Sequence, residues 1–176
     1  PPARPVPARW GRAGREGVVV EFRPAAGAPW VGNFAPGAGG VSEVRAHPDG
    51  RRVLVVAAGD AWAVDADAGA AEPVASGVGG IWPVPGAPDL VLSCDGLALA
   101  RHGPGGVVWH TRRLSWDGFA DIRLEDGRLT GAAWSAVDGG WAAFAVDLAT
   151  GRSAGGAYGA TDVEGWERLA PTPPGA

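Results

Sequence analysis

Tryptophan and arginine are the residue types in this chain with the greatest capacity for recognition. Nine of the 176 residues are tryptophan, and all fifteen Lys or Arg residues are arginine. Trp and Arg supply much of the binding energy at protein interfaces, and an aromatic ring can also be a platform for a sugar, a peptide or a base. A tryptophan in a strand can instead pack between sheets. The candidate binding residues, which stand in or beside predicted turns and loops, are Trp109, Arg112, Arg113, Trp116, Asp117 and Trp141.

Histidine and cysteine are not spaced for a metal site. His102 is predicted to face residue 107 across a hairpin, which places His110 near Leu99, at the far end of the ladder from His102. Two imidazoles that far apart cannot share one metal ion. Cys94, the single cysteine, lies in an apolar strand and is expected to be a buried, unreactive thiol. The sequence therefore predicts neither a metal nor a cofactor.

Several kinds of catalysis are excluded because the residues that they need are missing. The chain has no lysine, which excludes Schiff-base chemistry and a phosphate-binding GxxxxGK loop. No serine lies in a GxSxG motif. One close acidic series remains, Asp117, Asp121 and Glu125, and paired carboxylates are the groups that hydrolyse glycosidic bonds. A non-catalytic protein-binding module is therefore the main expectation, and a carbohydrate-active or small-molecule-active enzyme is the alternative.

The charge balance argues against nucleic acid as a partner. The net charge is −4, whereas nucleic-acid-binding domains are usually basic. Residues 1–15 hold four arginines, four prolines and no acid, which predicts an extended arm over 1–16. Residues 161–176 are expected to be a C-terminal segment and tail. The chain has no apolar run long enough to span a membrane and no evident signal peptide, so we expect a cytoplasmic protein with an unidentified protein partner and no membrane association.

Glycine and proline set the fold class. The chain contains 30 glycines and 16 prolines, which interrupt helices and favour short strands joined by turns. Asp-Gly between apolar runs is a strong hairpin signal and occurs at Asp95-Gly96, Asp126-Gly127 and Asp138-Gly139. The predicted strands are 18–22, 30–34, 41–46, 51–58, 61–65, 71–76, 81–84, 90–94, 97–102, 107–113, 119–124, 128–134, 141–146 and 152–158.

Similar turns recur along the chain at a nearly constant distance. Their closing glycines stand at positions 27, 69, 106 and 151, a spacing of about 40 residues, which is typical of a propeller blade. The hairpin Val146-Asp147-Leu148-Ala149-Thr150-Gly151 resembles the outer hairpin of blades in WD-repeat and quinoprotein-type propellers, and His47-Pro48-Asp49-Gly50-Arg51 resembles their inner-strand turn. The run from Ser115 to Gly151 is also similar to a segment of small uncharacterised bacterial proteins, which implies no activity.

The resemblance implies an all-β, propeller-like array of about three and a half to four antiparallel sheets over residues 17–160. An antiparallel β-sandwich is the alternative. Since closed propellers usually have at least four blades, three arrangements stay open: Thr161–Ala170 completes the first blade, the sheets stack openly, or two chains close a ring as a homodimer.

Overall fold

The computed structural model describes residues 8–10 and 17–158, and this part of the chain contains strands, turns and loops without a helix. The all-β prediction is therefore confirmed. Among these residues no helical segment exists that could cross a membrane. The strands form four sheets, and all pairings between them are antiparallel except one.

Each sheet is built from strands that are close together in sequence, and we label the sheets A to D in chain order. Sheet A has the order β1-β3-β2, sheet B β4-β5-β6-β7, sheet C β11-β10-β9-β8 and sheet D β12-β13-β14-β15. The strands are β1 (Ala8–Trp10), β2 (Val18–Phe22), β3 (Trp30–Phe34), β4 (Glu43–Ala46), β5 (Val53–Ala57), β6 (Asp60–Asp65), β7 (Ala70–Ala75), β8 (Ile81–Pro83), β9 (Leu90–Cys94), β10 (Ala98–Gly103), β11 (Gly106–His110), β12 (Phe119–Glu125), β13 (Arg128–Ser135), β14 (Gly140–Asp147) and β15 (Ser153–Gly155).

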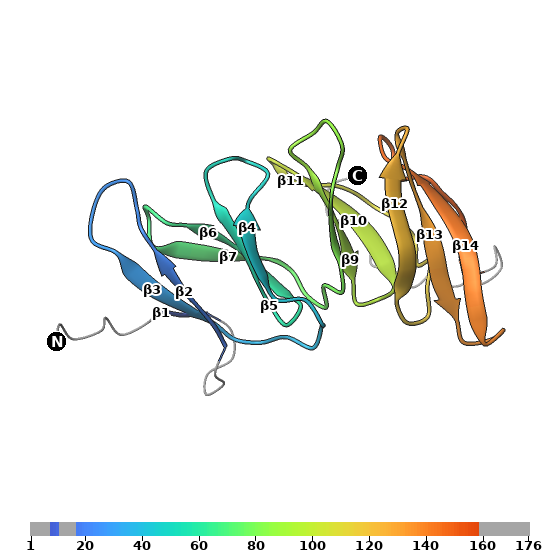
Figure 1. Cartoon of the computed structure of the whole chain (residues 1–176), viewed down its shortest axis with the longest axis horizontal. Helices are drawn as coiled ribbons and strands as arrows, with labels where there is room; N and C mark the ends of the chain where they lie inside the picture. Colours follow the sequence, from blue (N-terminus) through green and yellow to red (C-terminus); the bar gives the residue numbers. More distant parts are fainter. Residues whose placement is uncertain (1–7, 11–16, 159–176) are drawn as a thin grey trace, which may run out of the picture.

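The four sheets form a row in which sheets A and D lie at opposite ends (Figure 1). Strands of sheets A and B run obliquely in this view, whereas those of sheet D stand nearly upright, so successive sheets are rotated against one another. Within the described ranges the row is open, which corresponds to the predicted arrangement in which the sheets stack openly. The predicted closing segment Thr161–Ala170 lies outside the described residues.

The core consists of three apolar layers, one between each pair of neighbouring sheets. Phe22 and Phe34 of sheet A pack with Val55 and Val64 of sheet B. Sheets B and C share a second layer, and sheets C and D a third. The central strands are therefore apolar on both faces: in β9, Val91 belongs to the layer with sheet D, and the flanking leucines, Leu90 and Leu92, belong to the layer with sheet B.

The four landmark glycines lie in equivalent hairpins. They stand at the connections β2–β3, β6–β7, β10–β11 and β14–β15, and all have positive φ. Because a residue with a Cβ rarely adopts this conformation, glycine is what allows these hairpins to turn sharply at these points.

Sheet A departs from the pattern of the other three. Part of the predicted N-terminal arm, Ala8–Trp10, forms β1, which pairs in parallel with β3. The hairpin β2–β3 matches the third and fourth strands of the other sheets, and in the described residues no strand pairs with the far edge of β2. The prediction that only the last two strands of this blade are present is therefore correct for the hairpin, but it missed β1.

Candidate functional site

The loop between β11 and β12 carries four of the six predicted binding residues, and an internal clasp holds it. We use "clasp" for Arg112, Arg113, Trp116 and Tyr158. The Arg112 guanidinium donates to the carbonyl oxygens of Gly155 at 2.6 Å and Tyr158 at 3.4 Å. The rings of Trp116 and Tyr158 stack, with centroids 4.8 Å apart and planes at 16°. The Arg113 guanidinium lies 5.3 Å from the Trp116 ring and 4.7 Å from the Tyr158 ring.

Hydrogen bonds of Ser115 and of the Trp116 backbone join the loop to sheet D. Buried Ser115 donates from Oγ to the Gly118 carbonyl at 2.5 Å and accepts the Trp134 N–H at 3.0 Å. The Trp116 N–H donates to the Trp134 carbonyl at 2.9 Å. These bonds leave Trp116 37% exposed and the Asp117 side chain in solvent. Arg112 and Arg113 thus contact other parts of the same chain, whereas Trp116 and Asp117 are exposed.

Trp109, another predicted binding residue, lies in the core between sheets C and D. It is 8% exposed, and its Nε1–H donates to the Leu148 carbonyl at 2.8 Å. A Cβ added at Gly151 would lie 2.8 Å from the Trp109 ring, so glycine is needed there for the close approach as well as for its positive φ. Trp109 therefore packs between sheets C and D and does not lie on an exposed surface.

Trp141 is the most exposed of the predicted tryptophans. Phe144 and Val146 of β14 belong to the core with sheet C. Trp141 lies on the opposite face of this strand, because side chains alternate between the two faces, and it therefore points outward. Trp141 is 53% exposed and meets Trp134 of β13 edge to face, with centroids 5.4 Å apart. Register places small side chains beside this pair. The same register places polar and charged side chains toward the other end of this outer surface: Arg123, Glu125, Arg128, Thr130 and Asp147. We call only the apolar part of the surface the D face: Ala132, Trp134, Trp141, Ala143, Ala145 and Ala154.

His102 and His110 lie on one face of sheet C. His110 pairs with Ala100, one residue from the predicted Leu99, because β11 carries one extra residue where the register shifts between Arg101 and His102. A shift of one residue moves a side chain to the other face of a strand. His110 therefore lies on the same face as His102, toward sheet B, whereas a regular ladder would place it on the opposite face. It still stands at the end of β11 that is farther from the β10–β11 turn, as predicted.

His102 borders a polar cleft of about 400 Å³ between sheets B and C. The cleft is also lined by His47, Arg52 and Glu72, and Arg52 donates to Glu72 at 3.3 Å and to Asp49 at 2.6 Å. His102 is 5% exposed, and burial, followed by repulsion from His110 and His47, lowers its pKa to about 4. At neutral pH this imidazole is uncharged.

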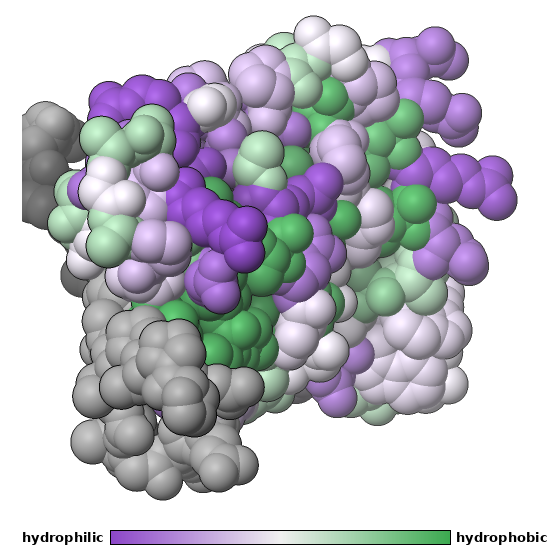
Figure 2. Space-filling view, turned by 60° about the vertical axis from the view of Figure 1, so that its left-hand side comes forward, coloured by the Kyte–Doolittle hydropathy of each residue, from purple (hydrophilic) through white to green (hydrophobic). Residues whose placement is uncertain are grey.

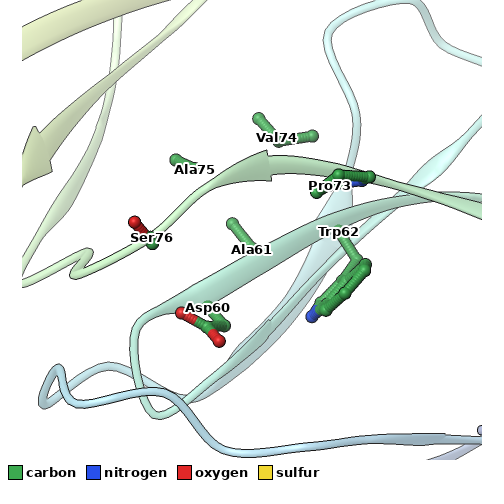
Figure 3. A pocket seen from close by; sticks show the side chains of 7 residues that line it. All are labelled: Asp60, Ala61, Trp62, Pro73, Val74, Ala75 and Ser76. Atoms are coloured by element: carbon green, nitrogen blue, oxygen red, sulfur yellow. The ribbon is translucent and has the colours of Figure 1, made fainter. Parts of the chain in front are cut away.

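The carboxylates of the enzyme alternative do not gather in a cleft. Asp117, Asp121 and Glu125 are all exposed, and Glu125 lines a hollow of about 260 Å³ between sheets C and D. Another hollow, of about 330 Å³, lies on strands β6 and β7 (Figure 3). It contains a single carboxylate, Asp60, and the Trp62 ring points away from Val74 and Ala75. Within the described ranges, no three His, Cys, Asp or Glu side chains group as metal ligands.

No family model, curated protein or solved structure matches the chain, so the argument for function depends on the geometry alone. Sequence reasoning identified Trp141 but missed the surface around it. Alternation of alanines with core residues along β14 was the available signal, since it marks a strand with one buried and one uncovered face.

Proposed function

We propose that this chain is a protein-binding module whose D face receives a partner protein that presents the face of a β-sheet. The observation that carries the proposal is the exposure of Trp141 on an outer sheet face, since the inner sheets B and C bury both faces of their central strands. An exposed apolar surface on a sheet is typical of an interaction site.

The side chains of the D face suit a second sheet. Packed sheets lie about 10 Å apart, and the side chains of their inner faces interdigitate. Ala132, Ala143 and Ala145 offer a shallow floor, and Trp141 projects beside it. Burying one tryptophan removes about 150–250 Å² from water, and such residues are often the anchors of an interface.

The loop residues predicted from the sequence extend this surface. Trp116 lies at the end of sheet D that carries Trp134, to which its backbone is hydrogen-bonded. Trp116 and Asp117 would form a partly exposed rim around the Trp134–Trp141 pair, with the clasp arginines holding the rim in place. Rim residues exclude water from an interface and contribute less to its affinity than the central anchor does.

A photo-cross-linking residue placed at Ala143 tests this proposal. Ala143 is exposed on the D face, so irradiation in cells that express the chain is expected to trap a protein at this position. The same residue at Val44, a half-exposed valine of β4, is the matched control. Trp141→Arg in the Ala143 variant is expected to abolish the cross-link. Equal labelling at positions 143 and 44, or labelling that survives Trp141→Arg, would contradict the proposal.

A further inference from the structure

Among the described residues, no sheet packs on the outer faces of the two end sheets, A and D. One is the D face. The other, which we call the A face, is the outer side of sheet A: Val19, Glu21, Val31 and Asn33. Its position follows from alternation, because Val18, Val20 and Phe22 pack against sheet B. Val19 is 62% exposed. Figure 2 turns the sheet A end of the molecule forward and shows hydrophobic surface among hydrophilic side chains on this side.

The two uncovered faces continue the stacking inside the chain. Sheet A covers one face of B, B covers one face of C, and C covers one face of D, each through its own apolar layer. A sheet packed on the D face would therefore extend the series by one step. Within residues 8–10 and 17–158, the A face is the outer sheet surface at the other end of that same series, so each copy of this part of the chain carries both surfaces.

Resting on the proposed function, we infer that the partner is a second copy of this chain, whose A face packs against the D face. The contact is head to tail, because it joins two different surfaces. Made twice between two copies, it closes a ring of eight sheets, four from each chain, which is at the upper end of the usual range for propellers. A ring leaves neither Val19 nor Trp141 exposed to water.

Light scattering of the purified chain, coupled to size-exclusion chromatography, tests the inference. The unmodified chain is expected to elute at twice the monomer mass of 17.8 kDa. Trp141→Arg and Val19→Arg are each expected to elute as monomers, whereas the control Val44→Arg stays dimeric. Circular dichroism verifies that each variant is folded. If Trp141→Arg does not fold, Ala143→Arg replaces it, since that side chain is exposed on the same face.

Mixing the two monomeric variants distinguishes a head-to-tail contact from a symmetric one. The Trp141→Arg chain keeps an intact A face and the Val19→Arg chain an intact D face, so the mixture is expected to form dimers through one contact. Dimers of Val19→Arg alone would indicate that D faces meet each other and would overturn the inference. Assemblies that keep growing with concentration would overturn the closed ring.

The failure of this inference can be told apart from the failure of the proposed function. If the purified chain stays monomeric at its highest soluble concentration, the second copy is not the partner. A Trp141-dependent cross-link from Ala143 to a different protein would then leave the proposed function standing. The absence of both the dimer and the cross-link would end both proposals.

Discussion

Two adjacent residues of β10 send polar side chains into opposite sheet contacts, and the chain accommodates them in different ways. Arg101 faces sheet D, where its Nε donates to Asp89 at 2.6 Å and its Nη1 to the Leu148 carbonyl at 2.6 Å. His102 faces sheet B, and its Nε2 is buried without a hydrogen-bond partner in the described chain. The contact between sheets C and D thus surrounds a charge with partners, whereas the contact between sheets B and C keeps its buried group uncharged.

The two contacts are therefore sensitive to different changes: one to the loss of a charged partner, the other to the gain of a charge. A charge with partners is destabilised when a partner is removed, because the remaining group is then buried and uncompensated. A neutral buried imidazole is destabilised when it gains a charge, because burial and neighbouring imidazoles oppose ionisation. Mutation should therefore break the contact of Arg101, and acid should break the contact of His102.

Asp89→Ala is expected to have the largest effect. It leaves the Arg101 guanidinium, whose side chain is 17% exposed, without its carboxylate, and the free energy of unfolding should fall by about 3 kcal/mol or more. Urea denaturation at pH 7 measures this. The exposed pair of Arg51 and Asp65 supplies the control, because Arg51→Ala should cost less than about 1 kcal/mol. Similar losses from the two variants would show that the pair between Arg101 and Asp89 is no better sheltered from water than a surface pair.

Acid is expected to have the next largest effect, through His102. Its folded-state pKa of about 4 lies below its ordinary value of 6.5, so the unfolded chain binds the proton first as the pH falls. The stability that His102 contributes is complete above about pH 6.5 and is lost as the pH drops toward 4, by about 2 kcal/mol between pH 8 and pH 5.

The variant His102→Leu isolates this contribution from that of the carboxylates. Its free energy of unfolding, followed by urea denaturation from pH 8 to pH 5, should change with pH by about 2 kcal/mol less than that of the unmodified chain. His110→Gln, at an exposed position, should keep most of the dependence. An unchanged pH profile in His102→Leu would mean that the imidazole titrates normally in the fold.

Trp109→Phe is expected to have a smaller effect on the contact between sheets C and D. The ring still fills the space beside Gly151, but the bond from Nε1 to the Leu148 carbonyl is lost. That carbonyl keeps its bond from Arg101, so the cost should be about 1 kcal/mol. Val108→Ala, at a half-exposed position of the same strand, should change the free energy of unfolding by less than about 0.5 kcal/mol. A loss of several kcal/mol for Trp109→Phe would show that the packing itself had been disturbed.

The strands of both contacts could be predicted from the sequence because turns and apolar runs alternate clearly. The predicted ranges 18–22, 30–34 and 90–94 match β2, β3 and β9, and most other strands differ by one or two residues at an end. Asp-Gly turns and apolar runs are local signals, and local signals determine hairpins. Parallel pairing of β1 with β3 joins residues that no turn connects, so no local pattern announced it.

The histidine neighbourhood could not be predicted, because a single extra residue decides it. Counting back from residues 102 and 107 with a regular ladder places His110 opposite Leu99 and on the other face from His102. The shift of register in β11 reverses that face. A bulge depends on how the strand fits against neighbouring sheets, which alternation along one strand does not reveal. The roles of Arg112 and Arg113 escaped prediction for a similar reason, since their partners, Gly155 and Tyr158, are more than forty residues away.

Arg113→Gln is expected to lower the free energy of unfolding least. It allows two arginines, Arg101 and Arg113, to be compared in different surroundings. Arg101 is charged between two sheets, whereas the guanidinium of Arg113 lies against the rings of Trp116 and Tyr158 at a partly exposed site. Contacts of this kind at exposed sites contribute about 0.5–1 kcal/mol. Urea denaturation followed by circular dichroism should therefore show a loss in that range, well below the loss from Asp89→Ala.

The size of the Arg113 effect also bears on the rim proposed for the D face. A small loss of stability, with a red shift of tryptophan fluorescence as the Trp116 ring becomes more exposed, would mean that the clasp sets the position of an accessible ring. A loss as large as that from Asp89→Ala would instead make the clasp part of the contact between sheets C and D. Trp116 would then be a structural residue, and the binding surface would be confined to the D face itself.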